Sequence, residues 1–122
     1  DKFLKIRRLN SKYYKNFLNN NKYFNIQKEI ENSSWFGFSI ILKSKYYKKF
    51  SKLRKNFEKI GIETRPIISG NFANQLVTKK YLRYYIPNKL QNADIIDKYG
   101  LMFGNNIIDL KDMIKKISLI KL

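Results

Sequence analysis

The segment from Tyr46 to Ile60 carries the clearest hydrophobic periodicity in this sequence. Its large apolar residues are separated by steps of four, three, four and three, so they share one stripe of an α-helix. Ser44 is a candidate N-cap, and Gly61 can take the left-handed conformation that ends a helix. A helix with one apolar stripe must bury it against another layer of structure. The residues of the stripe are Tyr46, Phe50, Leu53, Phe57 and Ile60.

Three segments around this helix have the composition of short strands. "SWFGFSIIL" (Ser34 to Leu42) is rich in aromatic and β-branched residues and predicts a buried strand that includes Trp35, Phe36 and Phe38 in the core. Gly37 within it marks a bulge or a place of close packing. "IETRPII" predicts a second strand that lies at an edge or ends at Pro66, because proline has no N–H to donate to a neighbour. "LMFG" predicts a third.

Further helical patterns stand at both ends of the chain. The first runs from Asp1 to about Asn20, the next follows a cap at Asn92 and ends at Gly100, and the last opens at Asp109. Residues 77–86 fit a short helix or an extended arm equally well. Near the start of the last helix, the negative charge of Asp112 interacts favourably with the helix dipole. The expected apolar stripes are Phe3, Ile6, Leu9, Tyr13 and Phe17 in the first helix, and Leu110, Met113, Ile117 and Ile120 in the last. Helices that alternate with few strands predict a small sheet covered by helices.

Composition limits the chemistry that the chain can perform. The 122 residues are 43% hydrophobic, enough for one compact domain. The sequence has no Cys and no His, which excludes disulfides, thiol catalysis, the usual zinc sites and a Ser-His-Asp triad. No apolar run approaches the roughly 18 residues that a membrane-spanning helix needs. We therefore expect a soluble, cytoplasmic protein, and the start at Asp1 suggests a piece of a longer one.

The charge of the chain raises a different class of function. With 26 Lys and Arg against 9 Asp and Glu, the formal net charge is +17, which suits a stand-alone binding module for RNA or an acidic partner. However, 16 of the 26 basic residues precede Gly61, mostly in segments predicted to be solvated helix faces. Lysine also lacks the planar donor fork with which arginine reads phosphates and bases. We disfavour nucleic-acid binding and keep this module as the alternative.

Ordered blocks of the sequence resemble a known family. "SSWFGFSI", an amphipathic helix, "GIETRPIISGNFANQ" and "NADIIDKYGLMFGNN" are similar to the C-terminal small domain of the DegT/DnrJ/StrS family of PLP-dependent nucleotide-sugar enzymes. "TRP" followed by "SGNF" and Gln is most similar to the 4-keto-6-deoxy-sugar 3-dehydratase branch. The likeness covers about Ser33 to Asn106, so 1–32 would be a helix and linker from the large domain and 33–122 the small domain. Gln75-Leu76 departs from the Gln-Pro usual in this branch.

The resemblance implies a fold and an activity. The fold would be α+β, a two-layer arrangement with a mostly antiparallel sheet of about three strands. The parent enzyme would be a homodimer that binds pyridoxal or pyridoxamine 5'-phosphate in its missing large domain. It would be a 3-dehydratase, in which His replaces the cofactor-linked Lys, or an aminotransferase, and would make deoxy or amino sugars for lipopolysaccharide and other surface polysaccharides. This chain alone would have no catalytic residue, cofactor or metal.

The same resemblance implies that the small domain helps to recognise a GDP- or CDP-4-keto-6-deoxyhexose and supports the dimer. Arginine can bind a phosphate or carbonyl oxygen through two parallel donors, and amides can both donate to and accept from hydroxyls. The candidate substrate-binding residues are therefore Arg65, Ser69, Asn71, Gln75 and, after the third strand, Asn105. Ser69, Gly70 and Asn71 are also the residues from which ordinary turns are built.

Overall fold

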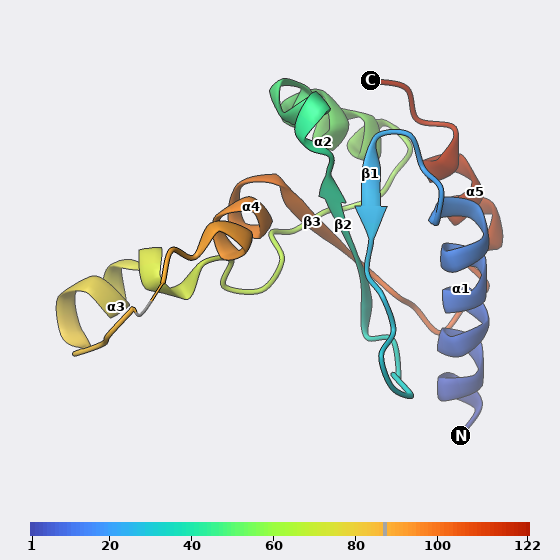
Figure 1. Ribbon diagram of the computed structural model, residues 1–122. Helices are drawn as coiled ribbons and strands as arrows, with labels where there is room; N and C mark the ends of the chain where they lie inside the picture. The colour runs from blue at the N-terminus through green and yellow to red at the C-terminus, as the bar shows by residue number, and fades with distance from the viewer. Residues whose placement is uncertain (87) are drawn as a thin grey trace.

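The computed structural model describes residues 1–86 and 88–122. Its centre is a three-stranded antiparallel sheet in the order β1-β2-β3, formed by β1 (Phe24–Ile26), β2 (Gly37–Leu42) and β3 (Gly100–Gly104) (Figure 1). Phe38 of β2 lies opposite Phe103 of β3, and Ile40 lies opposite Leu101. The aromatic and aliphatic side chains at these paired positions share one face of the sheet.

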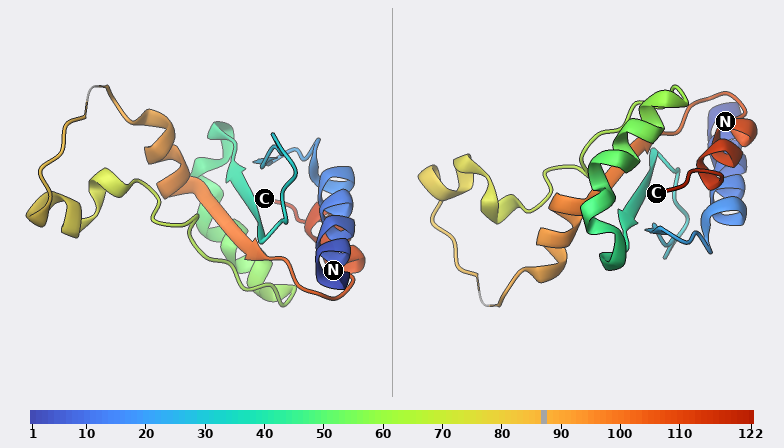
Figure 2. Two further views of the ribbon diagram at one scale, coloured as in Figure 1. Left: turned by 90° about the horizontal axis from the view of Figure 1, so that it is seen from below. Right: turned by 90° about the horizontal axis from the view of Figure 1, so that it is seen from above.

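In the described part of the chain, five α-helices accompany the sheet: α1 (Lys2–Leu18), α2 (Phe50–Lys59), α3 (Leu76–Tyr81), α4 (Gln91–Tyr99) and α5 (Lys111–Ser118). Two 3₁₀ segments, Ser44–Lys49 and Phe72–Asn74, precede α2 and α3. Figure 2 shows α1 and α5 side by side at one end of the molecule, and α3 at the other end. None of the helices within 1–86 and 88–122 is both long and apolar enough to cross a membrane.

The core lies between one face of the sheet and three helices. Tyr14 of α1 stacks on Phe38 with 4.6 Å between ring centroids, and Phe57 of α2 lies 5.7 Å from Phe103. Ile114 and Ile117 of α5 are fully buried in the same cluster. Each such side chain contributes about 1.5–3 kcal/mol when fully buried. This two-layer arrangement confirms the predicted α+β fold.

The end of α2 confirms the predicted cap. Gly61 has φ +77°, and its N–H donates to the Glu58 carbonyl at 2.9 Å. The N–H of Ile62 donates to the Phe57 carbonyl, also at 2.9 Å, and the Ile62 side chain is buried. These two bonds form a Schellman motif. The predicted N-cap was wrong. Ser44 is the first residue of a 3₁₀ segment, and the N-cap of that segment is Lys43, whose side chain makes no capping hydrogen bond.

The first helix forms as predicted, but its buried face is shifted. Phe3 and Leu9 are exposed, whereas the chain buries Asn10, Ser11, Tyr14 and Leu18. Two of these buried residues are polar, so apolar periodicity does not find them. Strand β1, which has three residues in an Asn- and Lys-rich stretch, was not predicted at all. Helix α1 and β1 pack on the same core as the residues after 33, and the boundary at residue 32 stays a prediction.

The predicted strand at 34–42 forms only from Gly37 onward. Trp35 has φ +53° and turns the chain, so that its own ring is buried while Phe36 is 68% exposed. The prediction that Phe36 is a core residue was therefore wrong. Close packing at Gly37 is confirmed, because a Cβ there would lie 3.0 Å from the Phe103 carbonyl oxygen.

The predicted strand "IETRPII" shrinks to a single bridge at the edge of β3. The Arg65 N–H donates to the Met102 carbonyl at 2.8 Å, and the Met102 N–H donates to the Arg65 carbonyl at 2.7 Å. Pro66 follows and cannot continue the ladder. The predicted edge position and end are thus confirmed, whereas a full strand was wrong.

The later helices follow the prediction with shifted starts. Asn92 lies inside α4, whose N-cap is Leu90, so the predicted cap was wrong. Helix α5 starts at Lys111, and Asp109 accepts a hydrogen bond from the Lys111 N–H at 2.8 Å. Asp112 lies in the first turn as predicted. Leu110, Ile117 and Ile120 are buried as expected, Met113 is half-buried, and Ile114 was missed.

Residues 66–86 form an arm that extends away from the sheet (Figures 1 and 2). The sequence left a helix and an extended segment open for 77–86, and the structure contains both. Helix α3 ends at Tyr81, and Leu82 is extended with φ −108° and ψ 138°. The arm begins at the candidate site.

Candidate functional site

Arg65 lies at the sheet edge, where its backbone bridge to Met102 fixes the position of its Cα. Its side chain is 72% exposed, and Nε and Nη2 donate to one oxygen of Glu63 at 3.2 and 3.1 Å. An ion pair so exposed contributes little stability and leaves donors of the guanidinium facing water. A ligand with a phosphate or carbonyl oxygen could therefore replace Glu63 at low cost.

Two hollows meet at Arg65. One, of about 200 Å³, is also lined by Arg54 of α2 and Asp97 of α4. The other, of about 280 Å³, is lined by Glu63 and by residues at the facing ends of β2 and β3. Arg54 was interpreted from the sequence as part of a solvated helix face. Only the packing of α2 beside β3 brings this second guanidinium to the same hollow.

The turn after Arg65 is held tightly against α4. Ser69 and Gly70 both have φ +55°, and the Gly70 N–H donates to the Ile67 and Ile68 carbonyls at 2.9 and 2.6 Å. A Cβ on Gly70 would lie 1.8 Å from the Asp97 carboxylate oxygen Oδ1. Glycine is therefore needed here for both backbone conformation and space.

Asn71 is buried and engaged in this turn. Its Nδ2 donates to Oδ1 of Asp94 at 2.8 Å, and its Oδ1 accepts from the Ala73 N–H at 3.1 Å. Asn74 donates to the same Asp94 oxygen at 3.0 Å. The hydrogen bond from Asn71, followed by that from Asn74, holds the pKa of Asp94 below its ordinary value despite some desolvation. Asn71 thus positions the loop.

Gln75 closes the same loop. Its Nε2 donates to the Ser69 carbonyl at 2.9 Å, and both residues are exposed. The structure therefore brings Ser69, Asn71 and Gln75 together, with Arg65 at the entry to their loop. Helix α4, on which this loop rests, is fixed in turn by Tyr99, whose ring stacks on Tyr47 at 3.6 Å between centroids.

Asn105 lies apart from this loop, in a buried network beside α1. It is 5% exposed, and its Nδ2 donates to the carbonyls of Arg7 and Trp35 at 3.0 and 2.9 Å. Its Oδ1 accepts from Asn10 at 3.0 Å. With donors and acceptor engaged inside the protein, Asn105 has the geometry of a structural residue. A role in substrate binding stays a prediction without a supporting contact.

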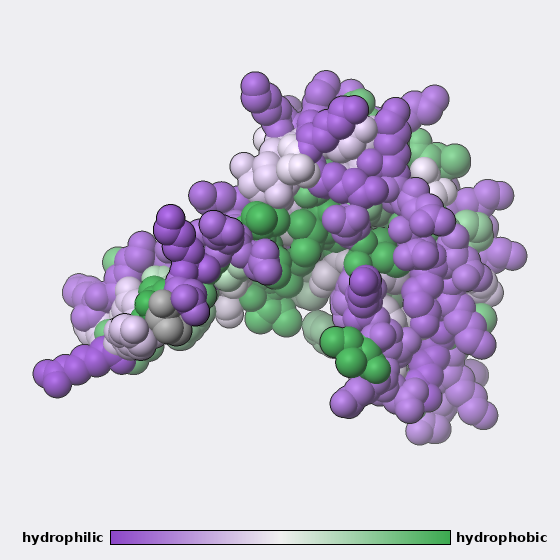
Figure 3. All heavy atoms as spheres, viewed as in Figure 1, coloured by the Kyte–Doolittle hydropathy of each residue, from purple (hydrophilic) through white to green (hydrophobic). Residues whose placement is uncertain are grey.

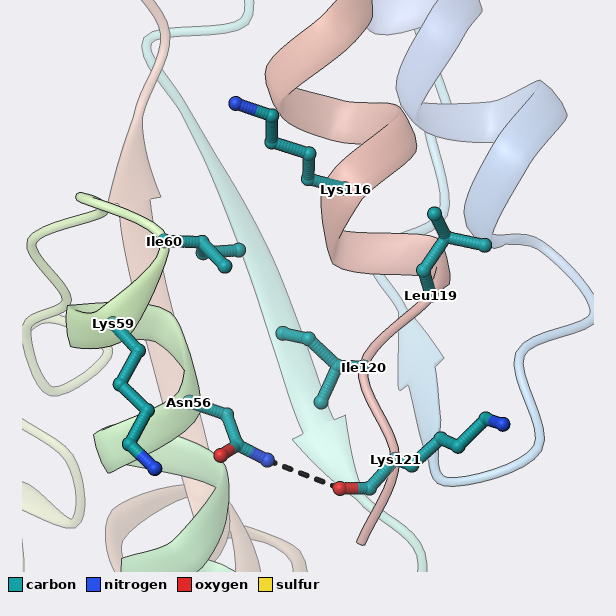
Figure 4. A pocket seen from close by; sticks show the side chains of 7 residues that line it. All are labelled: Asn56, Lys59, Ile60, Lys116, Leu119, Ile120 and Lys121. Carbon is teal, nitrogen blue, oxygen red and sulfur yellow. Dashed lines mark hydrogen bonds between the residues drawn. The ribbon is translucent and has the colours of Figure 1, made fainter.

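Another hollow, of about 490 Å³, lies between α2 and the C-terminal end of α5 (Figure 4). Its apolar lining comes from Ile60, Leu119 and Ile120, and its basic lining comes from Lys59, Lys116 and Lys121. Asn56 donates to the Lys121 carbonyl at 3.0 Å across this hollow. The loop from Arg65 to Gln75, called the Arg65 loop below, contributes no residue to the lining of this hollow.

Metal and cofactor sites need particular donor sets. Within the described parts of the chain, no group of His, Cys, Asp and Glu side chains could hold a metal ion. A PLP cofactor needs an acid for its ring nitrogen and a cradle for its phosphate. Asp94 lines one hollow with Lys79 and Lys89, but its Oδ1 accepts from Asn71 and Asn74 and so serves the fold of the arm.

No family model matches the chain. The chain is, however, 39% identical over 115 residues to a GDP-4-keto-6-deoxy-D-mannose 3-dehydratase from Yersinia pseudotuberculosis, a match that covers 94% of this chain. The solved structure of the E. coli GDP-4-keto-6-deoxy-D-mannose-3-dehydratase with bound hydrated PLP superposes with a TM-score of 0.87 at 38% identity over 97% of this chain. The chain is thus similar to one part of these 3-dehydratases, which agrees with the resemblance to the DegT/DnrJ/StrS family in its sequence.

The likeness in fold extends to solved structures of much lower sequence identity. The PseC aminotransferase of Helicobacter pylori, involved in the biosynthesis of pseudoaminic acid, has a TM-score of 0.73 at 14% identity, covering 95% of this chain and 31% of its own. That likeness concerns the fold alone. The chain spans about 29% of the length of the curated dehydratases and 30% of the E. coli structure. None of these matches supports the alternative of a stand-alone basic binding module.

Proposed function

We propose that this chain is the substrate-recognition domain of a PLP- or PMP-dependent nucleotide-sugar enzyme, with 3-dehydration as its reaction. The observation that carries the proposal is the contrast in identity on one shared fold: 38–39% to 3-dehydratases and 14% to an aminotransferase. The substrate would be a GDP-4-keto-6-deoxyhexose, the substrate class named for the relatives; a CDP sugar is the second candidate. The cofactor would be held by the part of the enzyme beyond this match.

Within that enzyme, Arg65 is the residue that reaches the substrate. It is exposed at the junction of two hollows, and its present partner Glu63 is a weak competitor. The exposed Ser69 and Gln75 add a hydroxyl and an amide nearby, while Asn71 fixes the loop that carries them. Polar groups of this kind discriminate between sugars, because a wrong substrate leaves them without a partner.

The proposal also includes a homodimer, a cytoplasmic location and a role in surface polysaccharide biosynthesis. An aminotransferase is the second candidate reaction, since the residue that distinguishes the two lies outside these 122 residues. In either case the catalytic base belongs to the remainder of the polypeptide, and this domain binds and orients the sugar.

The test uses the full-length gene product that contains this chain, supplied with PLP, glutamate and GDP-4-keto-6-deoxymannose. A sugar product that has lost its 3-hydroxyl group, identified by mass spectrometry and NMR, is the expected outcome. A 4-amino sugar that keeps this hydroxyl would identify an aminotransferase instead. No turnover of either the GDP or the CDP sugar would overturn the proposal.

A further inference from the structure

The exposed apolar side chains of this molecule are concentrated in the arm, residues 66–86. Among the described residues, 17 large hydrophobic side chains are exposed, and nine of them lie in this arm of 21 residues. They are Ile68, Phe72, Leu76, Val77, Tyr81, Leu82, Tyr84, Tyr85 and Ile86. A concentration of this kind is typical of a surface that another protein covers.

The arm does not use these side chains to pack on the body of the domain. Helix α3 packs mainly on the 3₁₀ turn Phe72–Asn74 of the same arm, and Thr78 is its only buried residue. Figures 1 and 2 show the arm pointing away from the sheet, and Figure 3 shows hydrophobic and hydrophilic side chains interleaved along it. The apolar area is therefore available to a partner.

The base of the arm is nevertheless firmly fixed. Asp94 of α4 accepts from Asn71 and Asn74, Gln75 donates to the Ser69 carbonyl, and Gly70 lies against Asp97. An arm that is already oriented loses less conformational entropy when it docks. The geometry suits a preformed interaction element.

The chemistry of the arm defines its partner. It carries Lys79, Lys80 and Arg83 and no acidic residue, and it presents three tyrosines. Tyrosine and arginine are enriched where interfaces contribute most binding energy. The complementary surface is apolar with an acidic edge. A second copy of this chain is a poor match, because its formal net charge is +17.

We propose that the arm docks on an acid-edged apolar surface in the part of the enzyme that the relatives have beyond this match, about 70% of their length. This inference rests on the proposed function in one respect only, namely that the chain works within a longer polypeptide. The docked arm would hold the Arg65 loop against the remainder of the enzyme.

The test places a photo-crosslinker, p-benzoylphenylalanine, at Tyr85 in the full-length protein. We expect crosslinks to peptides that lie outside the 122 residues and contain Asp or Glu. These peptides can belong to the same subunit or to its partner, and mixing isotope-labelled with unlabelled subunits would distinguish the two. The same probe at Ile30, which is 95% exposed on the body, is the control and should crosslink at least fivefold less. Crosslinks only to a second copy of this segment, or none above the control, would overturn the proposal.

Charge reversal tests the acidic edge. The triple variant Lys79→Glu/Lys80→Glu/Arg83→Glu should lower the crosslink yield at least fivefold. The matched triple variant Lys2→Glu/Lys5→Glu/Lys12→Glu, on exposed positions of α1, should leave it within twofold. Equal yields in the two variants would exclude an acidic edge. The crosslink does not depend on turnover, so a failed activity assay and a failed docking test give different results.

Discussion

The side-chain amide of Asn10 donates a hydrogen bond to the side-chain oxygen of Asn105 at 3.0 Å, although 95 positions separate the two residues. Asn10 also donates to the Ile108 carbonyl at 2.8 Å and accepts from the Leu110 N–H at 2.9 Å. Two buried amides thus join the first helix to the segment that leads into the last one.

Replacement of Asn105 by Ala should destabilise the domain by about 2–4 kcal/mol, because several buried polar groups then lose their partner. Urea unfolding of the 122-residue protein would measure this, with Asn92→Ala on the exposed side of α4 as a control that changes stability by less than about 0.5 kcal/mol. An Asn105→Ala protein of normal stability that uses its sugar substrate poorly would instead make Asn105 a ligand.

Gly70→Ala should loosen the arm. The new Cβ would overlap Oδ1 of Asp97 and would sit on a backbone with φ +55°, for a cost of about 1–3 kcal/mol. Hydrogen exchange of residues 66–75 would report faster opening of this segment. Gly104→Ala is the matched control, because a Cβ there meets no atom within 4 Å. Equal exchange in both variants would contradict the close approach to Asp97.

Acid should release the base of the arm. The pKa of Asp94 is lower in the folded state than its ordinary value of 3.8. At pH values between these two pKa values, the Asp94 carboxyl therefore binds more protons in the unfolded chain than in the folded protein. The stabilising contribution of Asp94 is therefore complete above its ordinary pKa and is lost as the pH falls through the folded pKa. Titration of the Asp94 carboxyl by NMR checks the direction, and Asn71→Ala should raise this pKa. An unchanged value in the variant would contradict the role of Asn71.

Arg65→Ala in the full-length enzyme should raise KM for the nucleotide sugar about 10- to 100-fold, the equivalent of one lost charge-assisted hydrogen bond of roughly 1.5–3 kcal/mol. The absorbance of the bound cofactor should not change. Arg65→Lys should recover only part of the loss, since lysine lacks the bidentate fork. Lys59→Ala, on the far side of α2 beside the hollow of Figure 4, serves as the control. Kinetics that stay normal in Arg65→Ala would remove Arg65 from the site.

The sequence predicted those features that local chemistry determines. Gly61 ends a helix because the residues just before and after it already specify a Schellman motif, and "LMFG" forms β3 because its residues suit a strand. Periodicity failed in α1, where buried Asn10 and Ser11 occupy positions that hydrophobicity alone assigns to water. It failed again at Phe36, because the positive φ of Trp35 has no signal in sequence.

The sequence predicted which loop carries the candidate site, but not which residues elsewhere in the chain contact that loop. Arg65, Ser69 and Gln75 lie close together in sequence, and the structure brings them into one exposed segment. Asn71 depends on Asp94, which is 23 positions away, and Arg54 reaches the Arg65 hollow only through the packing of α2. Contacts across such separations arise from the tertiary fold, which a single sequence does not display.

The packing of α1 against α5 has a consequence for biosynthesis. Within these 122 residues, the helix that is synthesised first rests on the helix that is synthesised last, and the amide of Asn10 likewise binds partners that follow β3. At roughly 5–20 residues per second, α1 would wait about 5–20 s for α5 to be made. During that interval the buried face of α1, with Tyr14 and Leu18, is only partly covered, so this segment is most prone to aggregation until α5 has been made.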